Sequence, residues 1–133
     1  MWNGSYQAKT GEQYIVNRAL IDSQGHRTEE VYNFCRRNPK ARPIKGEQRI
    51  YGQPWKVSVL EKVQGKTGRQ LPIPGGLQLF RLDTNHFKDL LAGKLNVAPG
   101  QPGSFNLHRD VSNEYVKHMT AEYQDERGLW RQP

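Results

Sequence analysis

The chain has 133 residues and a mass of 15.4 kDa, enough for one domain and too little for a second one of ordinary size. Its single cysteine, Cys35, excludes an internal disulfide and a zinc site built from several cysteines. Lys and Arg outnumber Asp and Glu by 20 to 13, a net charge of +7 that favours an anionic partner such as nucleic acid. No stretch approaches the roughly 18 apolar residues of a membrane span, and no apolar signal segment opens the chain, so we expect a soluble, intracellular protein.

The first half of the chain has the pattern of a strand, a helix and a second strand. The aliphatic and β-branched run 14–21 predicts a buried strand that ends at Asp22. Thr28 can cap an amphipathic helix, which ends before Pro39. A short strand around 42–45 completes a β-α-β unit, for which a parallel strand pair is the default.

The second half predicts further strands, two helices and loops rich in Gly and Pro. The elements expected in chain order are a strand at 55–59, a loop at 64–76, a strand at 77–82 that ends in Asp83, a helix capped by Thr84, a loop at 98–103, a short strand at 104–107, and a helix from Ser112 to Gly128 with Tyr123 on its apolar face. Residues 1–10 are expected to be a poorly ordered start. The remainder, 11–133, is predicted to form a single α/β domain with a mixed sheet.

Two aspartates follow predicted strands, where functional groups gather in open α/β sheets. Asp22 ends the first strand and Asp83 ends a later one. Carboxylates at strand ends are the oxygen ligands that Mg²⁺ prefers, and two such ions about 4 Å apart can activate a water and stabilise a leaving oxygen. Aspartate is also a common turn residue, and Asp83 could do no more than precede a helix cap. Both therefore stand as candidate catalytic residues and metal ligands, with the turn interpretation open.

Three basic residues are candidates for contacts to DNA phosphates. Lys45 ends the strand after the helix, so a parallel pair would bring its ammonium group near Asp22, although a solvated lysine before a turn is the alternative. Arg27 lies in the loop after Asp22, and Lys88 lies on the outer side of the helix after Asp83. The other basic residues are dispersed, which predicts a basic folded surface instead of a basic arm.

The motifs follow the order of a known family. The sequence IDSQGHRT at 21–28 runs into VYNFCR at 31–36, and together they resemble the nuclease region of GpA-type large terminase subunits of tailed phages. In that family, a strand ending in an Ile-Asp-Ser-Gly-Gly-like turn leads into a helix with a Val-Tyr-x-Phe-Cys core. Further matches are IKG at 44–46, LDT at 82–84 with KDLL at 88–91, and the helix from Tyr115 to Glu122, which resembles the family's LTAE-like helix. The resemblance covers residues from about 12 to 131.

The resemblance implies a ribonuclease H-like fold and an endonuclease that cuts concatemeric double-stranded DNA for packaging into capsids. It implies two divalent ions, Mg²⁺ or Mn²⁺, held by acidic residues from separate strands, and Asp22 matches one of these acids. The terminase small subunit and the portal are the implied protein partners, in the cytoplasm of the bacterial host. The ATPase half of such subunits has no counterpart in this chain.

Two further features of the family also lack a counterpart. The family's opening strand, which carries the first acid, does not occur before Gly11, and its closing acid lies beyond a tryptophan that resembles Trp130. The resemblance therefore predicts an incomplete ribonuclease H-like domain whose nuclease activity alone is weak or absent. The alternative is a non-catalytic basic α/β module that binds DNA or a phage packaging partner.

Overall fold

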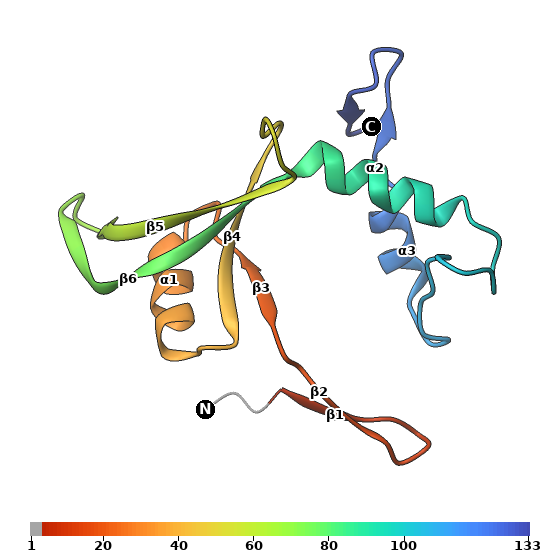
Figure 1. Cartoon of the computed structure of the whole chain (residues 1–133), viewed down its shortest axis with the longest axis horizontal. Helices are drawn as coiled ribbons and strands as arrows, with labels where there is room; N and C mark the ends of the chain where they lie inside the picture. The colour runs from red at the N-terminus through yellow and green to blue at the C-terminus, as the bar shows by residue number, and fades with distance from the viewer. Residues whose placement is uncertain (1–3) are drawn as a thin grey trace. The chain divides into compact units, whose positions relative to one another are not determined.

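The computed structural model describes residues 4–133, which form two compact units, one ending at Leu82 and the other beginning at Asp83. Within these residues, the first unit holds a short hairpin and a four-stranded sheet with one helix, and the second holds two helices and another short hairpin (Figure 1). None of the helices in this part of the chain is long and apolar enough to cross a membrane.

The sheet of the first unit is mixed, with the strand order β3-β4-β6-β5. Its strands are β3 (Ala19–Asp22), β4 (Ala41–Glu47), β5 (Trp55–Gln64) and β6 (Gln70–Asp83). Strands β3 and β4 are parallel, and the register places Asp22 opposite Ile44, while β5 and β6 are antiparallel. The predicted parallel pair and the predicted α/β class with a mixed sheet are confirmed.

Helix α1 (Thr28–Arg37) covers one face of this sheet and closes the core of the first unit (Figure 1). Cys35 of α1 is 3% exposed and packs with Ala41, Ile73 and Leu77 of the sheet. Burial raises the pKa of the Cys35 thiol, so the neutral form is favoured. Cys35 is therefore a core residue of the α1–sheet contact.

The aliphatic run 14–21 is not one buried strand, contrary to the prediction. Its start belongs to an exposed hairpin formed by β1 (Ser5–Gln7) and β2 (Gln13–Ile15), in which Ile15 is 61% exposed. Only the end of the run joins the sheet, as the edge strand β3. The polar residues 17–18 separate the two strands, and an edge strand with one packed face leaves alternate aliphatic side chains in solvent.

The Gly- and Pro-rich stretch 64–76, predicted to be a loop, mostly belongs to β6. A tight turn joins β5 to β6, and the pairing then shifts register between Leu60 and Lys62. The segment of β6 that bulges there contains Gly75 and Gly76, whose φ angles of +75° and +71° are readily adopted only by glycine. Pro74, Gly75 and Gly76 therefore mark an irregularity inside a long hairpin, where the missing N–H of Pro74 interrupts no regular ladder, while Pro72 is paired with Lys62.

In the second unit, an exposed aspartate of a helix bonds to both strands of a hairpin. Its elements are α2 (Thr84–Leu95), α3 (Asn113–Met119), β7 (Tyr123–Gln124) and β8 (Trp130–Arg131). Asp89 of α2 accepts hydrogen bonds from Trp130 Nε1 at 2.8 Å and from Gln124 Nε2 at 3.3 Å. One carboxylate thus ties both strands of the hairpin to the helix.

The final helix is shorter than predicted, and the segment after it is a hairpin. Helix α3 ends at Met119, and Tyr123 belongs to β7 instead of the helix's apolar face. Asp125 accepts hydrogen bonds from backbone N–H groups across the turn, which contains Gly128 at φ +72°. These local bonds favour a hairpin over a continued helix. The strand expected at 104–107 is not formed in the described part of the chain.

Of the three helix caps predicted from the sequence, one is confirmed by the structure. The Ser112 hydroxyl accepts a hydrogen bond from the backbone N–H of Tyr115 at 3.1 Å, so the predicted cap of α3 is confirmed. Thr84 is the first residue of α2 and Asp83 is its N-cap, because a carboxylate accepts the free N–H groups of a helix start and complements its dipole. Thr28 is likewise the first residue of α1 and not its N-cap.

Ser23 locks the end of β3 onto β4. This residue is 5% exposed, and both its hydroxyl and its backbone N–H donate to the carbonyl oxygen of Ile44, at 2.7 and 3.0 Å. The two bonds extend the parallel pair by one residue beyond Asp22 and fix where the following loop begins.

Replacing Ser23 with Ala should lower the free energy of unfolding of the first unit by about 1 kcal/mol, because one hydrogen bond to Ile44 is lost from a buried position. Urea denaturation followed through amide signals of β3 and β4 measures this change. Ser5→Ala, at an exposed position of β1, is the matched control. Equal stability of the two variants would contradict the anchoring role of Ser23.

Candidate functional site

Asp22 lies at the carboxyl end of β3, on the outer face of the sheet. Ile21, the residue before it, packs against the core, and successive side chains of a strand point to opposite faces. Asp22 is exposed, and its Oδ1 accepts a hydrogen bond from the backbone N–H of Gln24 at 3.0 Å. No other hydrogen bond to this carboxylate is made by residues 4–133, so it keeps acceptor capacity for a ligand.

The loop between β3 and α1 is held by side chains at both ends. The hydroxyl of Thr28 donates to the carbonyl oxygen of Ser23 at 2.7 Å, which closes the loop onto its own start. The side chain of Gln24 accepts a hydrogen bond from the backbone N–H of Gly46 in β4 at 3.0 Å. Asp22 therefore starts a loop with a defined path across the end of the parallel pair.

Two of the three predicted phosphate contacts belong to the same edge of the sheet. Lys45 directly follows Ile44, the partner of Asp22, and is exposed. By strand alternation its stem leaves the face opposite to that of Asp22, and its flexible stem gives the ammonium group a wide reach. Arg27 immediately precedes α1; its side chain is 83% exposed and contacts Glu30 at 3.5 Å. An exposed pair of this kind is easily exchanged for a phosphate.

Glu29, in the first turn of α1, is a polar residue whose environment the sequence did not reveal. Its Oε2 is shielded from solvent and has no hydrogen-bond partner in the described residues. The residue borders a cavity of about 480 Å³ that also includes His26 and Lys66. A buried carboxylate oxygen without a partner is costly, and sequence alone indicates only a favourable helix-dipole position.

Glu47, at the end of β4, is a second acid that sequence reasoning missed, and it is already paired. Arg81 of β6 donates to both of its carboxylate oxygens, with Nη2 to Oε2 at 2.8 Å. The hydrogen bonds from Arg81 hold the pKa of Glu47 below its usual range. The pair spans 34 positions in sequence, so no local pattern could indicate it. A charge held in this way stabilises the sheet and is not free for a metal.

The other two predicted site residues belong to the second unit and have structural partners there. Asp83 is 8% exposed and accepts a hydrogen bond from the backbone N–H of His86 at 3.0 Å, as the N-cap of α2. Lys88 forms an ion pair with Glu122. Each role accounts for the residue without a ligand, and their part in a site remains a prediction.

The described residues supply the donor type for a divalent ion but not a complete site. An exposed carboxylate such as Asp22 is the oxygen ligand that Mg²⁺ and Mn²⁺ accept. Residues 4–133 contain no group of three His, Cys, Asp or Glu side chains placed to hold a metal ion. A two-ion centre is therefore not formed by these residues alone.

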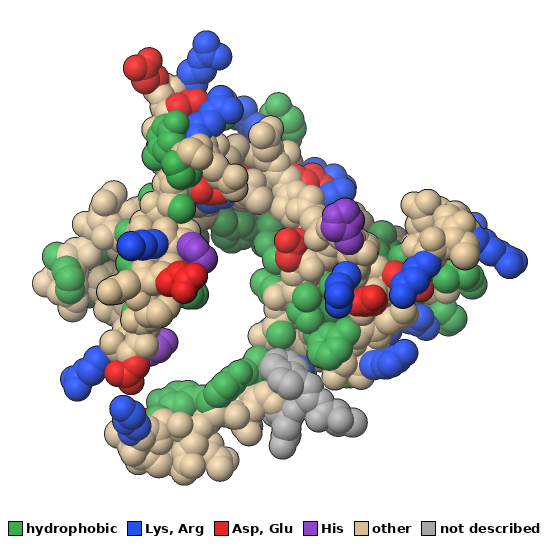
Figure 2. Space-filling view, turned by 180° about the vertical axis from the view of Figure 1, so that it is seen from behind, with side chains coloured by type: hydrophobic (Ala, Val, Ile, Leu, Met, Phe, Trp, Pro, Cys, Tyr) green, Lys and Arg blue, Asp and Glu red, His purple; other side chains and the backbone are tan. Residues whose placement is uncertain are grey.

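The excess positive charge is spread over the surface. On the face seen in Figure 2, Lys and Arg side chains are scattered among polar and apolar residues. This distribution agrees with the prediction of a basic folded surface, and it suits many weak contacts to a polyanion better than one strong one.

Comparison with known proteins gives one match. No curated protein and no solved structure matches the chain. The family described as terminase large subunit gpA, endonuclease domain, matches residues 1–133, the full sequence. The match agrees with the motif order around Asp22 and with an α/β unit built on a mixed sheet. The chain belongs to the endonuclease-domain family of the terminase large subunit gpA.

Proposed function

We propose that this chain is a metal-dependent endonuclease domain that cuts concatemeric double-stranded DNA during phage packaging, with Asp22 as a metal ligand. The observation that carries the proposal is the exposed Asp22 carboxylate at the carboxyl end of a parallel strand pair, an edge of the sheet to which Lys45 and Arg27 also belong. Membership of a terminase endonuclease family supports the reaction class. Mg²⁺ or Mn²⁺ would supply the Lewis acid and the activated water.

At this edge of the sheet, the acidic residue would bind the cation and the basic residues would contact the DNA phosphates. Asp22 would hold the cation through its free acceptor capacity, while the loop bonds of Gln24 and Thr28 keep it in place. Lys45 and Arg27 would contact phosphates on either side of the scissile position. Asp83 and Lys88 would join as a further ligand and a further contact only after giving up the helix cap and the ion pair with Glu122.

The wider assignments follow from the family. A ribonuclease H-like topology, the terminase small subunit and the portal as partners, and action in the cytoplasm of the host are part of the proposal. The mixed sheet of the first unit is compatible with that topology.

A non-catalytic basic module that binds DNA or a phage packaging partner is the second candidate. The observation that favours it is the lack of a three-residue metal group among residues 4–133, together with the capping role of Asp83. The two candidates differ in one property, which is cleavage of DNA in the presence of a divalent ion.

Asp22→Asn should abolish nicking of supercoiled plasmid DNA by the chain with Mn²⁺ or Mg²⁺, because the amide keeps the shape of the side chain and removes the charge that holds the ion. Glu61→Gln, an equal charge change at an exposed position of β5, is the control and should cut like the unchanged chain. Conversion of supercoiled to open circular DNA on agarose gels measures the rate.

Equal nicking by the Asp22→Asn and Glu61→Gln variants would contradict the role of Asp22. Binding of duplex DNA without nicking, together with no Mn²⁺ binding that depends on Asp22, would contradict the endonuclease proposal and favour the non-catalytic module.

Duplex DNA should bind without sequence preference, and its affinity should fall steeply with salt, by a log–log slope of about −0.9 for each phosphate contact. Lys45→Gln and Arg27→Gln should each reduce the magnitude of the slope by about that amount, whereas Asp22→Asn should leave it unchanged. Fluorescence anisotropy at several salt concentrations measures the slope. Binding that does not depend on salt would exclude phosphate contacts as its source.

A further inference from the structure

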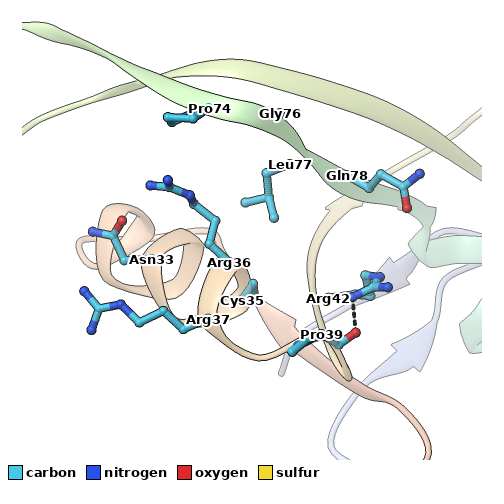
Figure 3. Close-up of a pocket in the computed structure, with 10 residues that line it drawn as sticks. All are labelled: Asn33, Cys35, Arg36, Arg37, Pro39, Arg42, Pro74, Gly76, Leu77 and Gln78. Atoms are coloured by element: carbon cyan, nitrogen blue, oxygen red, sulfur yellow. Dashed lines mark hydrogen bonds between the residues drawn. The ribbon is translucent and has the colours of Figure 1, made fainter.

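An arginine-lined pocket lies at the end of α1 farthest from Asp22. The pocket has a volume of about 630 Å³ and is enclosed by the last turns of α1, the start of β4 and the bulged part of β6 (Figure 3). Arg36, Arg37 and Arg42 contribute to its wall, and none of the ten residues drawn in Figure 3 is acidic. Arg36 extends toward Pro74 of β6, across the opening between helix and strand.

The arginines of α1 are not needed to complete the helix. Asn38 satisfies the carbonyl groups at the helix end: its backbone N–H donates to Phe34 and Cys35, and its side-chain amide donates to Phe34 at 2.9 Å. Within the described residues, neither Arg36 nor Arg37 forms an ion pair or a hydrogen bond through its side chain. Their guanidinium groups are therefore available to a ligand.

Arg42 is held in place by the backbone. Its Nη1 donates to the carbonyl oxygens of Pro39 and Ala41, the latter at 2.9 Å (Figure 3). These bonds occupy one guanidinium nitrogen, and the other N–H groups of the planar guanidinium can bond to a ligand. Arg42 is thus a pre-oriented cation on the side of the pocket opposite to α1.

The charge of the pocket is positive by a wide margin. The end of a helix carries about half a negative charge, so three guanidinium groups leave a net charge of roughly +2.5. Arginine forks match phosphate oxygens in pairs of parallel hydrogen bonds. A concave site with several arginines and no acid in its wall therefore suits a phosphate better than an extended apolar ligand.

We propose that the Arg36–Arg37–Arg42 pocket binds a backbone phosphate of double-stranded DNA and positions the duplex relative to Asp22. The inference rests on the proposed function and adds a second contact point to it. Helix α1 has ten residues, so the pocket lies roughly 15 Å from the Asp22 end of the helix. That span corresponds to roughly four base pairs of duplex at 3.4 Å each.

The test is the salt dependence of binding to a short fluorescent duplex. The double variant Arg36→Gln, Arg37→Gln should reduce the magnitude of the log–log slope by about 0.9 for each arginine that contacts phosphate. Arg36→Lys should keep the slope and weaken binding, because the ammonium group keeps the charge without the fork. The double variant Lys66→Gln, Arg69→Gln, in the exposed turn between β5 and β6, is the control that removes the same two positive charges. Circular dichroism spectra confirm that the variants are folded.

An Arg36→Gln, Arg37→Gln variant that behaves like the Lys66→Gln, Arg69→Gln control would overturn the proposal. Competition identifies the ligand: unlabelled duplex should displace the probe, and inorganic phosphate should do so only at far higher concentration. Displacement by polyglutamate at a lower charge concentration than by duplex would assign the pocket to an acidic protein surface and overturn the DNA assignment.

Nicking separates this inference from the proposed function. Asp22→Asn should bind the duplex with an unchanged salt slope, because Arg36 and Arg37 are intact, whereas the Arg36→Gln, Arg37→Gln variant should lose part of the slope although Asp22 is intact. Lost binding in this variant, with no effect of Asp22→Asn on nicking, would support the pocket and contradict the role of Asp22. Unchanged binding in the Arg36→Gln, Arg37→Gln variant, with nicking lost in Asp22→Asn, would contradict the pocket and support the role of Asp22.

Discussion

The parallel pairing of β3 with β4 is the constraint on which the rest of the first unit depends. Parallel strands end at the same edge of a sheet, so one register decides which side chains meet there. The register places Asp22 opposite Ile44, and Ser23 fixes it by donating twice to the same carbonyl group. A slip by one residue would turn Asp22 toward the core and Ile21 toward solvent, at the cost of burying a charge.

The short loop between β3 and α1 determines where the arginines of α1 lie. Because the loop after Asp22 closes on itself through Thr28, α1 starts directly at the edge of the sheet and runs back along it to Arg36 and Arg37. Helix α1 therefore separates the exposed carboxylate of Asp22 from a group of arginines. If the proposed phosphate contacts are made, the Asp22 carboxylate would repel the phosphates unless a cation lies between them, which is the electrostatic reason to expect a divalent ion at Asp22.

Sequence patterns predicted the features that depend on residues close together in the chain. The strand–helix–strand order, the position of Asp22 at the end of a strand and the burial of Cys35 follow from periodicity and turn residues within a few positions. The family was visible in the motif from 21 to 36. The Ser112 cap was also predictable, because it depends on residues three positions apart.

The features that could not be predicted depend on contacts between distant residues. The prolines and glycines of β6 are typical of a loop, and only pairing with β5 makes them part of a bulged strand. The Glu47–Arg81 pair and the bridge from Asp89 to the final hairpin likewise join distant segments.

Paramagnetic broadening by Mn²⁺ tests the central claim, that Asp22 at the end of the parallel pair is the metal ligand of this domain. With substoichiometric Mn²⁺ added to the ¹⁵N-labelled chain, amide signals at 22–25 and 44–46 should broaden most, because these residues follow Asp22, pair with it or bond to its loop. The broadening should disappear in Asp22→Asn and persist in Glu61→Gln. Strongest broadening in the second unit, around Asp83, or equal broadening in both variants, would contradict the account.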